Sequence, residues 1–548
     1  MKKISKKASF ENTTTLLENS AESSSEPTKH FHIVAIGASA GGLEALEQFF
    51  RNVPKNCGIA FVVIQHLDPN HVGIMPELLQ RITEMKVEQA TDFLQVLPNH
   101  LYVIPPNKSM SILNGFLHLF EPVESHGLRL PIDIFFRSLA EDQRENSIGV
   151  ILSGMGSDGS LGLKAIKEKS GIVLVQDPKS AKFDGMPQSA INSVIVDIVA
   201  KANELPEKLI TFLKINPLAS KKYDIDDISK SNLEKIVILL RAQTGHDFSL
   251  YKKNTLFRRI ERRMNVHQID KIAMYVRYLQ ENPIELEILF KELLIGVTNF
   301  FRDTLVWEKL KNSILPDLFK QLPNGYVLRA WITACSTGEE AYSLAIILRE
   351  AYEKVIKYKN LTIQIFATDI DSDAIDIARR GHFSSNIIAD VSPERISQFF
   401  TKEVEGYRIS NAIREMVVFA PHNVIKDPPF TKLDMLMCRN LLIYMEPELQ
   451  RKLMNLFQYS LNPNGVMILG SAENENSQNN QFTPIDSKLK IYKRNEIRVA
   501  SEMVDFPSSF IHTRKEMADN IKTVKVTDNV QLLADINYYY SALHLPAC

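Results

Sequence analysis

Three residues that could carry out acyl transfer lie in the first third of the chain, each just after an apolar, strand-like segment. Ser39 closes the stretch IVAIGAS and is the serine of a G-x-S-x-G pattern. His66 follows FVVIQ, and Asp158 follows GVILSG within MGSDG. A serine nucleophile, a histidine base and a carboxylate that orients the base form the arrangement used for acyl transfer. His71 is an alternative base that the sequence leaves open.

Strand ends must position these residues. Apolar runs alternate with helical patterns, which predicts an α/β domain with a mostly parallel sheet, where active groups gather at the carboxyl ends of strands. Past Ser39, a glycine turn and helical spacing place the serine near a helix N-terminus, whose free N–H groups can hold an oxyanion. The strands that we predict here are Ile33–Ile36, Ile59–Gln65, Leu101–Ile104, Gly149–Ser153 and Gly171–Val175.

The glycine turn at Ser39 has a second interpretation, because similar turns hold the phosphates of dinucleotides. This turn lacks the G-x-G-x-x-G pattern of that function, and the Tyr-x-x-x-Lys pair of short-chain dehydrogenases is missing from the sequence. A serine, a histidine and an aspartate at three strand ends therefore favour an esterase over an NAD(P) oxidoreductase.

A second strand–turn–helix pattern covers Val327–Leu348, with the turn TACSTGEE. A further strand, Ile363–Thr368, ends at Asp369, where a carboxylate can accept hydrogen bonds from ribose hydroxyls. The stretch LNPNGVM before a late strand is typical of methyltransferases that use S-adenosylmethionine, although an ordinary helix–strand turn also fits it. Strands are predicted in this half at Val327–Trp331, Ile363–Ala367, Met416–Ala420, Met435–Met437 and Val466–Leu469.

The composition allows several soluble domains. The chain has 548 residues with 45% hydrophobic and 24% charged residues, and its formal net charge of -1 gives no global indication of nucleic-acid binding. Its four cysteines include no C-x-x-C pair, so we predict neither a metal site nor a disulfide framework. No apolar run approaches the ~18 residues of a membrane span.

We predict two doubly wound α/β domains, the second Rossmann-like, joined through a small all-helical subdomain. The predicted segments are a disordered stretch at 1–29, the first α/β domain at 30–213, a linker at 214–230, the helical subdomain at 231–296, the second α/β domain at 297–495, and a tail or start of an extension at 496–548.

The helical stretch contains LFRRIERRM, which spaces four arginines for one helix face. Such a stripe is commonly a solvated surface, but it could also dock an acidic helical partner. No aromatic stacking platform accompanies it, which argues against nucleic acid. The arginines predicted to dock a partner are Arg258, Arg259, Arg262 and Arg263.

Residues 31–210 resemble the catalytic domain of CheB-type chemotaxis protein-glutamate methylesterases, through IGASAGGLEAL, VVIQHLDPNH, YVIPPN, PIDIFFRSLA and ILSGMGSDGSLGL. The resemblance implies that Ser39, His66 and Asp158 form the catalytic triad, and that the backbone N–H of Met155 contributes to an oxyanion hole. Ala40 departs from the threonine common in the family. The stretch before the first strand is too short for the family's receiver domain.

Residues 230–495 resemble CheR-type receptor methyltransferases, through LFRRIERRM, GVTNFFRD, WITACSTGEEAYSLA, ATDIDSDAI, APHN, MCRNLLIYM and LNPNGVMILGSAE. One cofactor contact of that family falls on Gly296, which has no side chain to offer. The resemblance implies a receptor-recognising helical subdomain, with Arg302 and Tyr444 near the transferred methyl group. It implies S-adenosylmethionine contacts from Thr298, Arg302, Glu340, Asp369, Asn423 and Asn440, with Val424 and Leu441 on the adenine side.

Together, the two resemblances imply one chain that methylates receptor glutamates with S-adenosylmethionine and also hydrolyses the methyl esters, or deamidates glutamine, without a metal. Its partners would be methyl-accepting chemotaxis receptors, with a histidine kinase or sensor module as a further candidate. It would act in the cytoplasm, recruited to membrane receptors. The alternative function is a signalling scaffold that has lost one or both activities.

Overall fold

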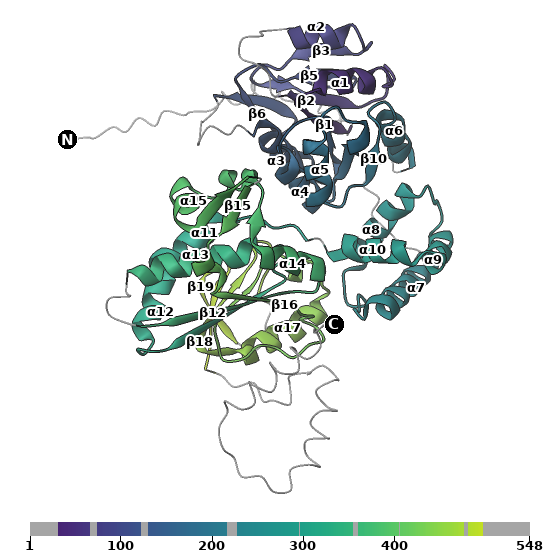
Figure 1. Cartoon of the computed structure of the whole chain (residues 1–548). Coiled ribbons are helices and arrows are strands. Elements are labelled where there is room, and N and C mark those ends of the chain that lie inside the picture. Colours follow the sequence, from purple (N-terminus) through teal and green to yellow (C-terminus); the bar gives the residue numbers. More distant parts are fainter. Residues whose placement is uncertain are drawn as a thin grey trace, which may run out of the picture. The chain divides into compact units, whose positions relative to one another are not determined.

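A computed structural model describes residues 31–65, 74–121, 130–215, 227–294, 296–354, 360–404, 406–475 and 481–496 (Figure 1). The chain divides into two compact units. The first holds the residues up to Asp224 together with Asn265–Asp270, and the second holds Ile225–Met264 and the residues from Lys271 onward. The segment predicted to be disordered, residues 216–226 of the predicted linker, and all but residue 496 of the predicted tail lie outside the described residues.

The first unit contains a seven-stranded parallel sheet with the strand order β10-β9-β8-β1-β2-β5-β3. The five strands predicted for this half correspond to β1, β2, β5, β8 and β9, within two residues at each end. The strands are β1 (Ile33–Ala38), β2 (Ala60–Gln65), β3 (Lys86–Gln89), β5 (His100–Val103), β8 (Ser147–Ile151), β9 (Ile172–Gln176) and β10 (Ile198–Ala200).

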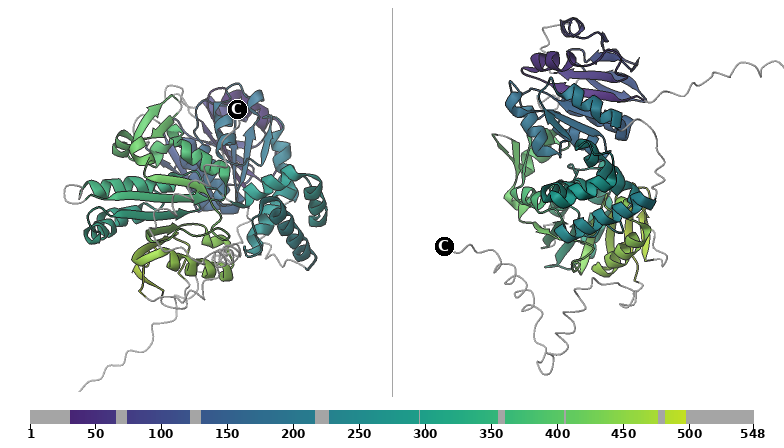
Figure 2. Two further views of the ribbon diagram at one scale, coloured as in Figure 1. Left: turned by 60° about the horizontal axis from the view of Figure 1, so that its bottom comes forward. Right: turned by 90° about the vertical axis from the view of Figure 1, so that its right-hand side faces the viewer.

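Helices cover both faces of this sheet, as a doubly wound fold requires (Figures 1 and 2). Alternate residues of β1 point to opposite faces, so Val34 and Ile36 join one hydrophobic core and Ile33 and Ala35 the other. The first core includes residues of α1 (Gly42–Phe50), α2 (Ile74–Gln80) and α6 (Leu205–Ile215), and the second those of α3 (Pro131–Gln143), α4 (Ser160–Glu168) and α5 (Gly185–Ser193).

A small antiparallel sheet that the sequence did not predict adds to the second core, through β4 (Leu94–Gln95), β6 (Ser109–Leu113) and β7 (Phe116–Phe120).

The second unit begins with an all-helical region, as predicted. Its helices are α7 (Asp227–Thr244), α8 (Lys253–Val266, whose last two residues belong to the first unit), α9 (Ile272–Glu281) and α10 (Pro283–Leu294). Helices α7 and α8 are joined by a short loop, Gly245–Lys252. Within the described ranges, no helix combines the length and the apolar character that a membrane span needs.

The second unit also contains a seven-stranded sheet with the order β16-β12-β11-β17-β18-β20-β19, in which only the pairings of β20 are antiparallel. Every strand predicted for this half is present. The strands are β11 (Val327–Thr333), β12 (Thr362–Asp369), β16 (Val417–Pro421), β17 (Leu433–Cys438), β18 (Leu461–Leu469), β19 (Phe482–Asp486) and β20 (Ile491–Arg494).

The helices that accompany this sheet differ widely in length, from four residues in α16 to fifteen in α13. They are α11 (Thr304–Lys309), α12 (Leu315–Gln321), α13 (Glu339–Glu353), α14 (Ser372–Arg380), α15 (Pro393–Phe399), α16 (Asn411–Arg414) and α17 (Pro447–Ser460). A separate antiparallel sheet, absent from the sequence-based prediction, contains β13 (His382–Phe383), β14 (Phe400–Glu403) and β15 (Gly406–Ile409).

The prediction of an exposed arginine stripe on α8 is wrong. Only Arg258 is exposed, whereas Arg259, Arg262 and Arg263 are buried. Arg259 Nη1 donates to the backbone oxygen of Glu292 at 2.6 Å, and Arg262 Nη1 lies 3.7 Å from a carboxylate oxygen of Glu292. These arginines therefore fix α10 against α8 and do not form a continuous docking surface.

Arg263 forms the most complete of these buried contacts. Its Nε and Nη2 donate to the two carboxylate oxygens of Glu285 at 2.9 and 2.7 Å, and Tyr275 Oη donates to the same carboxylate at 2.8 Å. Glu285 is only 4% exposed. A carboxylate that receives three hydrogen bonds from two helices thus holds α8, α9 and α10 together.

Substitution of this carboxylate should destabilise the helical region strongly. Glu285→Ala leaves a buried guanidinium without its counter-ion, and we expect the free energy of unfolding of the second unit to fall by about 3–5 kcal/mol. Glu281→Ala is the matched control on α9, because Glu281 pairs with Arg277 in solvent and should cost less than about 1 kcal/mol. Calorimetric melting of both variants checks this, and equal midpoints would contradict it.

Candidate active sites

Strand order brings the first set of predicted residues to one sheet edge. β1, which precedes Ser39, lies between β2 and β8, and all three strands run parallel. Ala38 pairs with Gln65, so Ser39 and His66 follow paired strand ends. His66 and the alternative base His71 both lie outside the described residues. Their roles therefore stay predictions.

The turn after β1 presents Ser39 in a constrained backbone. Gly41 has a φ of 69°, a left-handed conformation that favours glycine, and Gly42 N donates to Ser39 O at 2.8 Å as α1 begins. Ser39 N donates to Ser153 O at 3.0 Å, which ties this turn to the segment after β8. Ser39 itself is half-buried.

Ser153 is a buried residue that the sequence analysis missed, and it fixes three segments around the turn. Its Oγ donates to Ala40 O at 3.0 Å and accepts a hydrogen bond from Phe183 N at 3.0 Å. Gly154 follows, and a Cβ built there would lie 3.0 Å from the Cβ of Ser39. The one indication in the sequence that Ser153 is functional is its position between β8 and Asp158.

Asp158 is buried at 4% exposure and is held by the N-terminus of α3. Its two carboxylate oxygens accept hydrogen bonds from Ile132 N at 3.0 Å and Asp133 N at 2.9 Å. The first turn of α3 thus supplies backbone N–H donors to both oxygens of this carboxylate and fixes its orientation. The side chain of Met155 is 61% exposed, and the oxyanion role of its backbone N–H remains a prediction.

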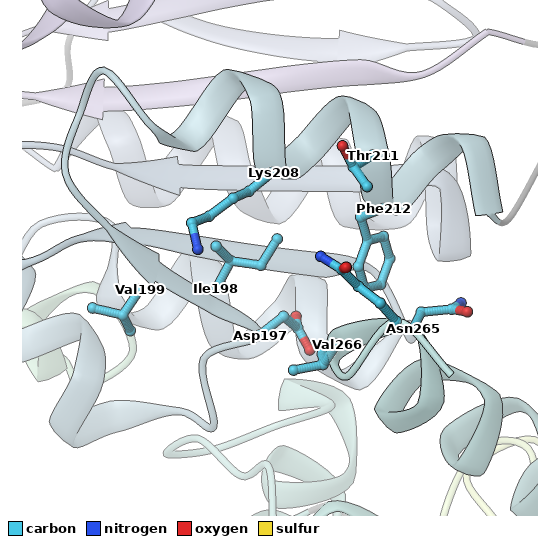
Figure 3. Close-up of a pocket in the computed structure, with 9 residues that line it drawn as sticks. Asp197, Ile198, Val199, Lys208, Thr211, Phe212, Asn265 and Val266 are labelled. Carbon is cyan, nitrogen blue, oxygen red and sulfur yellow. The ribbon is translucent and has the colours of Figure 1, made fainter. Parts of the chain in front are cut away.

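A pocket in the first unit lies at the opposite edge of the same sheet (Figure 3). Asp197, which precedes β10, is one of its lining residues. The carboxylate of Asp197 accepts hydrogen bonds from Lys167 Nζ at 2.9 Å and from Val173 N at 2.8 Å, so it serves the packing of α4 and β9. This pocket is separate from the edge that carries Ser39.

In the second unit, the predicted cofactor residues also follow the carboxyl ends of parallel strands. β11 lies between β12 and β17, and β16 borders β12. Glu340, Asn423 and Asn440 lie in the segments after these strands, and Asp369 is the last residue of β12. Val424 and Leu441, predicted on the adenine side, are the next residues after two of them and are half-buried.

Asp369 ends β12 and lies beside the turn that follows β11. One carboxylate oxygen accepts a hydrogen bond from Ser336 N at 2.8 Å and the other from Asp371 N at 2.9 Å. Burial raises the pKa of Asp369 to about 6, against the opposing effect of these backbone N–H groups. Ser336 has a φ of 48° and Gly338 a φ of 95°, so the turn uses left-handed backbone to bring its N–H groups to the carboxylate.

Glu340 and Arg302 are joined by a buried arginine that the sequence analysis missed. Arg439 Nη1 donates to a carboxylate oxygen of Glu340 at 2.9 Å, and Arg439 Nη2 donates to Arg302 O at 3.1 Å and also binds the carboxylate of Asp303. Burial raises the pKa of Glu340, while the charges of Arg439 and Arg302 oppose that rise. The one indication in the sequence that Arg439 belongs to the site is its position beside Asn440 in MCRNLLIYM.

A second missed residue, Glu473, holds the loop that carries Asn440 and Leu441. Its carboxylate accepts hydrogen bonds from Leu442 N at 2.7 Å and Gly470 N at 2.6 Å. Asn440 has a φ of 61°, which the surrounding loop must stabilise. Burial raises the pKa of Glu473, opposed by the backbone N–H groups that bind it.

The remaining predicted residues lie in two connecting segments of the second unit. Thr298 and Arg302 are half-buried in the connection between α10 and α11, and Tyr444 is half-buried after β17. A Cβ built on Gly296 would lie 3.3 Å from Ser336 Oγ. That hydroxyl oxygen is buried and has no hydrogen-bond partner within the described residues.

These residues fit S-adenosylmethionine, which carries a ribose, an amino-acid end and a positive sulfonium. Asp369 can accept hydrogen bonds from ribose hydroxyls, and the buried hydroxyl of Ser336 lies beside it without a partner. Glu340 offers an acceptor for an ammonium group, and Arg302 offers donors for a carboxylate. Across the described residues, no group of His, Cys, Asp and Glu side chains could hold a metal ion.

The fold and the strand-end residues define an esterase-like α/β domain followed by a nucleotide-binding methyltransferase domain. Three family models match in succession: CheB methylesterase at residues 34–209, the all-alpha domain of CheR methyltransferase at 231–294, and its SAM binding domain at 296–491. The chain belongs to the CheB methylesterase family in its first part and to the CheR methyltransferase family in its second. S-adenosylmethionine is therefore its methyl donor.

Relatives of each part support this assignment. A putative protein-glutamate methylesterase/protein-glutamine glutaminase of Leptospira interrogans is 34% identical over 33% of this chain and 94% of its own length. Chemotaxis protein methyltransferase 2 of Vibrio cholerae is 31% identical over 42% of this chain and 81% of its own length. An uncharacterized 104.1 kDa protein of Rhodobacter capsulatus is 33% identical over 76% of this chain, which spans 46% of that protein.

The raised pKa of Asp369 predicts a pH dependence of cofactor binding. The ionised carboxylate is a much stronger acceptor for ribose hydroxyls than the protonated acid, and below about pH 6 the free protein holds Asp369 protonated. Affinity for S-adenosylhomocysteine should therefore be lost as the pH falls through this value, becoming about tenfold weaker near pH 5 than near pH 7.

Isothermal calorimetry across this range checks the prediction. Asp369→Asn is the control. This variant should bind S-adenosylhomocysteine weakly at every pH, and its affinity should show no change near pH 6. Glu340 is a second carboxyl group of this site whose pKa is raised by burial. A step that persists in Asp369→Asn would assign the titration to another group.

Proposed function

We propose that this chain adds methyl groups to glutamate side chains of chemotaxis receptors and removes them again by ester hydrolysis. The observation that carries the proposal is that each of two sheets in one chain has, at the carboxyl ends of its parallel strands, residues that we propose to react or to bind the cofactor. Ser39 and Asp158 follow neighbouring strands in the first unit. In the second unit Asp369 ends β12, and Asn423 and Asn440 follow β16 and β17.

In the second unit the protein's task is to bind and orient. S-adenosylmethionine supplies, when bound, a methyl group activated by a sulfonium. A glutamate side chain has an ordinary pKa of about 4.3 and is ionised at neutral pH, so its carboxylate needs no general base. Asp369 would hold the ribose and Glu340 and Arg302 the amino-acid end, while Tyr444 and Arg302 border the transferred methyl group. Catalysis then comes mainly from positioning.

In the first unit the chemistry is covalent. Ser39 Oγ forms a bond to the ester carbonyl carbon, and His66 takes the hydroxyl proton and returns it to the departing methoxide, which leaves as methanol. Asp158 holds the imidazole and stabilises its positive form, and the N–H of Met155 binds the oxyanion. Water then hydrolyses the acyl-enzyme to a free glutamate. The same route applied to glutamine would release ammonia.

The partners of this proposal are methyl-accepting chemotaxis receptors, met at the cytoplasmic side of the membrane. Each methyl group removes one negative charge from a receptor helix and each hydrolysis restores it, and such a change can bias a two-state signalling assembly. A histidine kinase or sensor module is a second proposed partner.

Labelled methyl groups test both activities in one experiment. Receptor membranes are incubated with S-adenosylmethionine labelled in its methyl group, and label is followed on the receptor and in released methanol. Ser39→Ala removes the nucleophile, so receptor label should rise and methanol release should fall by at least about a thousandfold. Asp369→Asn should lower the initial rate of receptor labelling about tenfold or more, because one buried acceptor for the ribose is lost.

The two variants serve as controls for each other, since each leaves the other unit unchanged. If the wild type labels the receptor and Ser39→Ala still releases methanol, the esterase mechanism is wrong. If neither protein labels a receptor of the host organism although S-adenosylmethionine binds, the scaffold function becomes the better account.

A further inference from the structure

The loop between α7 and α8, Gly245–Lys252, binds the segments that carry the proposed cofactor contacts. Lys252 N donates to Tyr444 O at 2.9 Å, and Lys252 Nζ donates to Ile443 O at 2.8 Å. Tyr251 forms an antiparallel bridge with Met445. The helical region is thus joined by backbone hydrogen bonds to the loop that holds Asn440 and Tyr444.

The same loop reaches a second segment of the cofactor edge through His246. His246 Nδ1 lies 3.0 Å from Nδ2 of Asn423, and His246 Nε2 lies 3.1 Å from Tyr251 Oη. His246 is only 3% exposed and Tyr251 only 8%. Asn423 is one of the residues proposed to contact S-adenosylmethionine, so the imidazole connects that residue to the helical region.

The direction of these hydrogen bonds follows from the contacts of Asn423. Its Oδ1 accepts a hydrogen bond from Ile425 N at 3.0 Å, which fixes the amide so that Nδ2 faces the imidazole as a donor. His246 Nδ1 must then be the acceptor, and the ring proton resides on Nε2, which donates to Tyr251 Oη. Burial lowers the pKa of His246 to about 4, so the ring is neutral near pH 7, as this arrangement requires.

Aromatic contacts hold the imidazole in this position. The His246 ring packs edge-on against Phe248, with ring centroids 4.5 Å apart, and against Phe290 of α10 at 6.3 Å. A ring fixed by packing and by two hydrogen bonds has little rotational freedom, so it transmits its position to the Asn423 amide. Burial raises the pKa of Tyr251, and the nearby charge of the Asp369 carboxylate raises it further.

We propose that His246 is a positioning residue for S-adenosylmethionine binding, acting through the side-chain amide of Asn423. The affinity of the second unit for its cofactor would then depend on His246. This residue belongs to the helical region and not to the nucleotide-binding domain. The inference rests on the proposed methyltransferase function, and it names a residue that fixes one wall of that site.

Calorimetric titration of the full chain with S-adenosylhomocysteine tests the proposal. His246→Phe keeps the aromatic packing but removes both hydrogen bonds, and it should weaken binding about fivefold, the factor for one net hydrogen bond. His246→Asn places an amide oxygen near the position of Nδ1, so it should accept from Asn423 and stay within about twofold of the wild type. Ser249→Ala, on the exposed side of the same loop, is the control and should change nothing.

A double-mutant cycle with Asn423→Ala separates positioning from general damage to the fold. If His246 acts through Asn423, His246→Phe should have less than about a twofold further effect in the Asn423→Ala background. Provided that the wild type binds S-adenosylhomocysteine, two results would overturn the proposal. One is additive effects of His246→Phe and Asn423→Ala on affinity, and the other is an equal loss of affinity in His246→Phe and His246→Asn. A wild type that binds no S-adenosylhomocysteine would overturn both this inference and the methyltransferase function.

Discussion

Neighbouring parallel strands end at the same edge of a sheet, and in both units the side chains proposed for chemistry follow such ends. A helical crossover carries the chain from the end of one strand back to the start of the next, so each strand delivers its following residues to one edge. In the first unit β1 lies between β2 and β8, and in the second β11 lies between β12 and β17. The same geometric constraint thus gathers the residues proposed for covalent chemistry in one unit and those proposed for ligand binding in the other.

The two edges differ in how they stabilise charge. Asp158 is held by backbone N–H groups in the first turn of a helix. Glu340 is instead paired with the buried Arg439, which also binds the Asp303 carboxylate. Asp369 accepts hydrogen bonds from the backbone N–H groups of Ser336 and Asp371, and burial raises its pKa to about 6. A ligand that carries positive charge would relieve this excess of carboxylates at the second edge.

Apolar runs made the long sheet strands predictable, because buried parallel strands are continuously hydrophobic. Among the antiparallel strands that were missed, β4 and β13 have two residues each and are too short to give a periodic pattern. The arginine stripe was mispredicted for a different reason. Spacing shows which arginines share a helix face, but Arg263 meets Glu285 22 residues later and Arg259 meets Glu292 33 residues later. His246 and Arg439 were not predicted, because their partners Asn423 and Glu340 are also distant in sequence.

The carboxylate of Asp158 has a counterpart in Asp133, on the helix that Asp158 caps. Asp133 is 1% exposed, and its Oδ1 accepts a hydrogen bond from Gly162 N at 2.7 Å, in the first turn of α4. Each acid thus holds the start of a helix, and the two helices are locked to each other. Selection for folding alone would retain Asp158, even in a lineage whose domain had ceased to hydrolyse esters. Among relatives of this chain, an intact aspartate at this position would accordingly be poor evidence of activity, and the serine would be the residue to inspect.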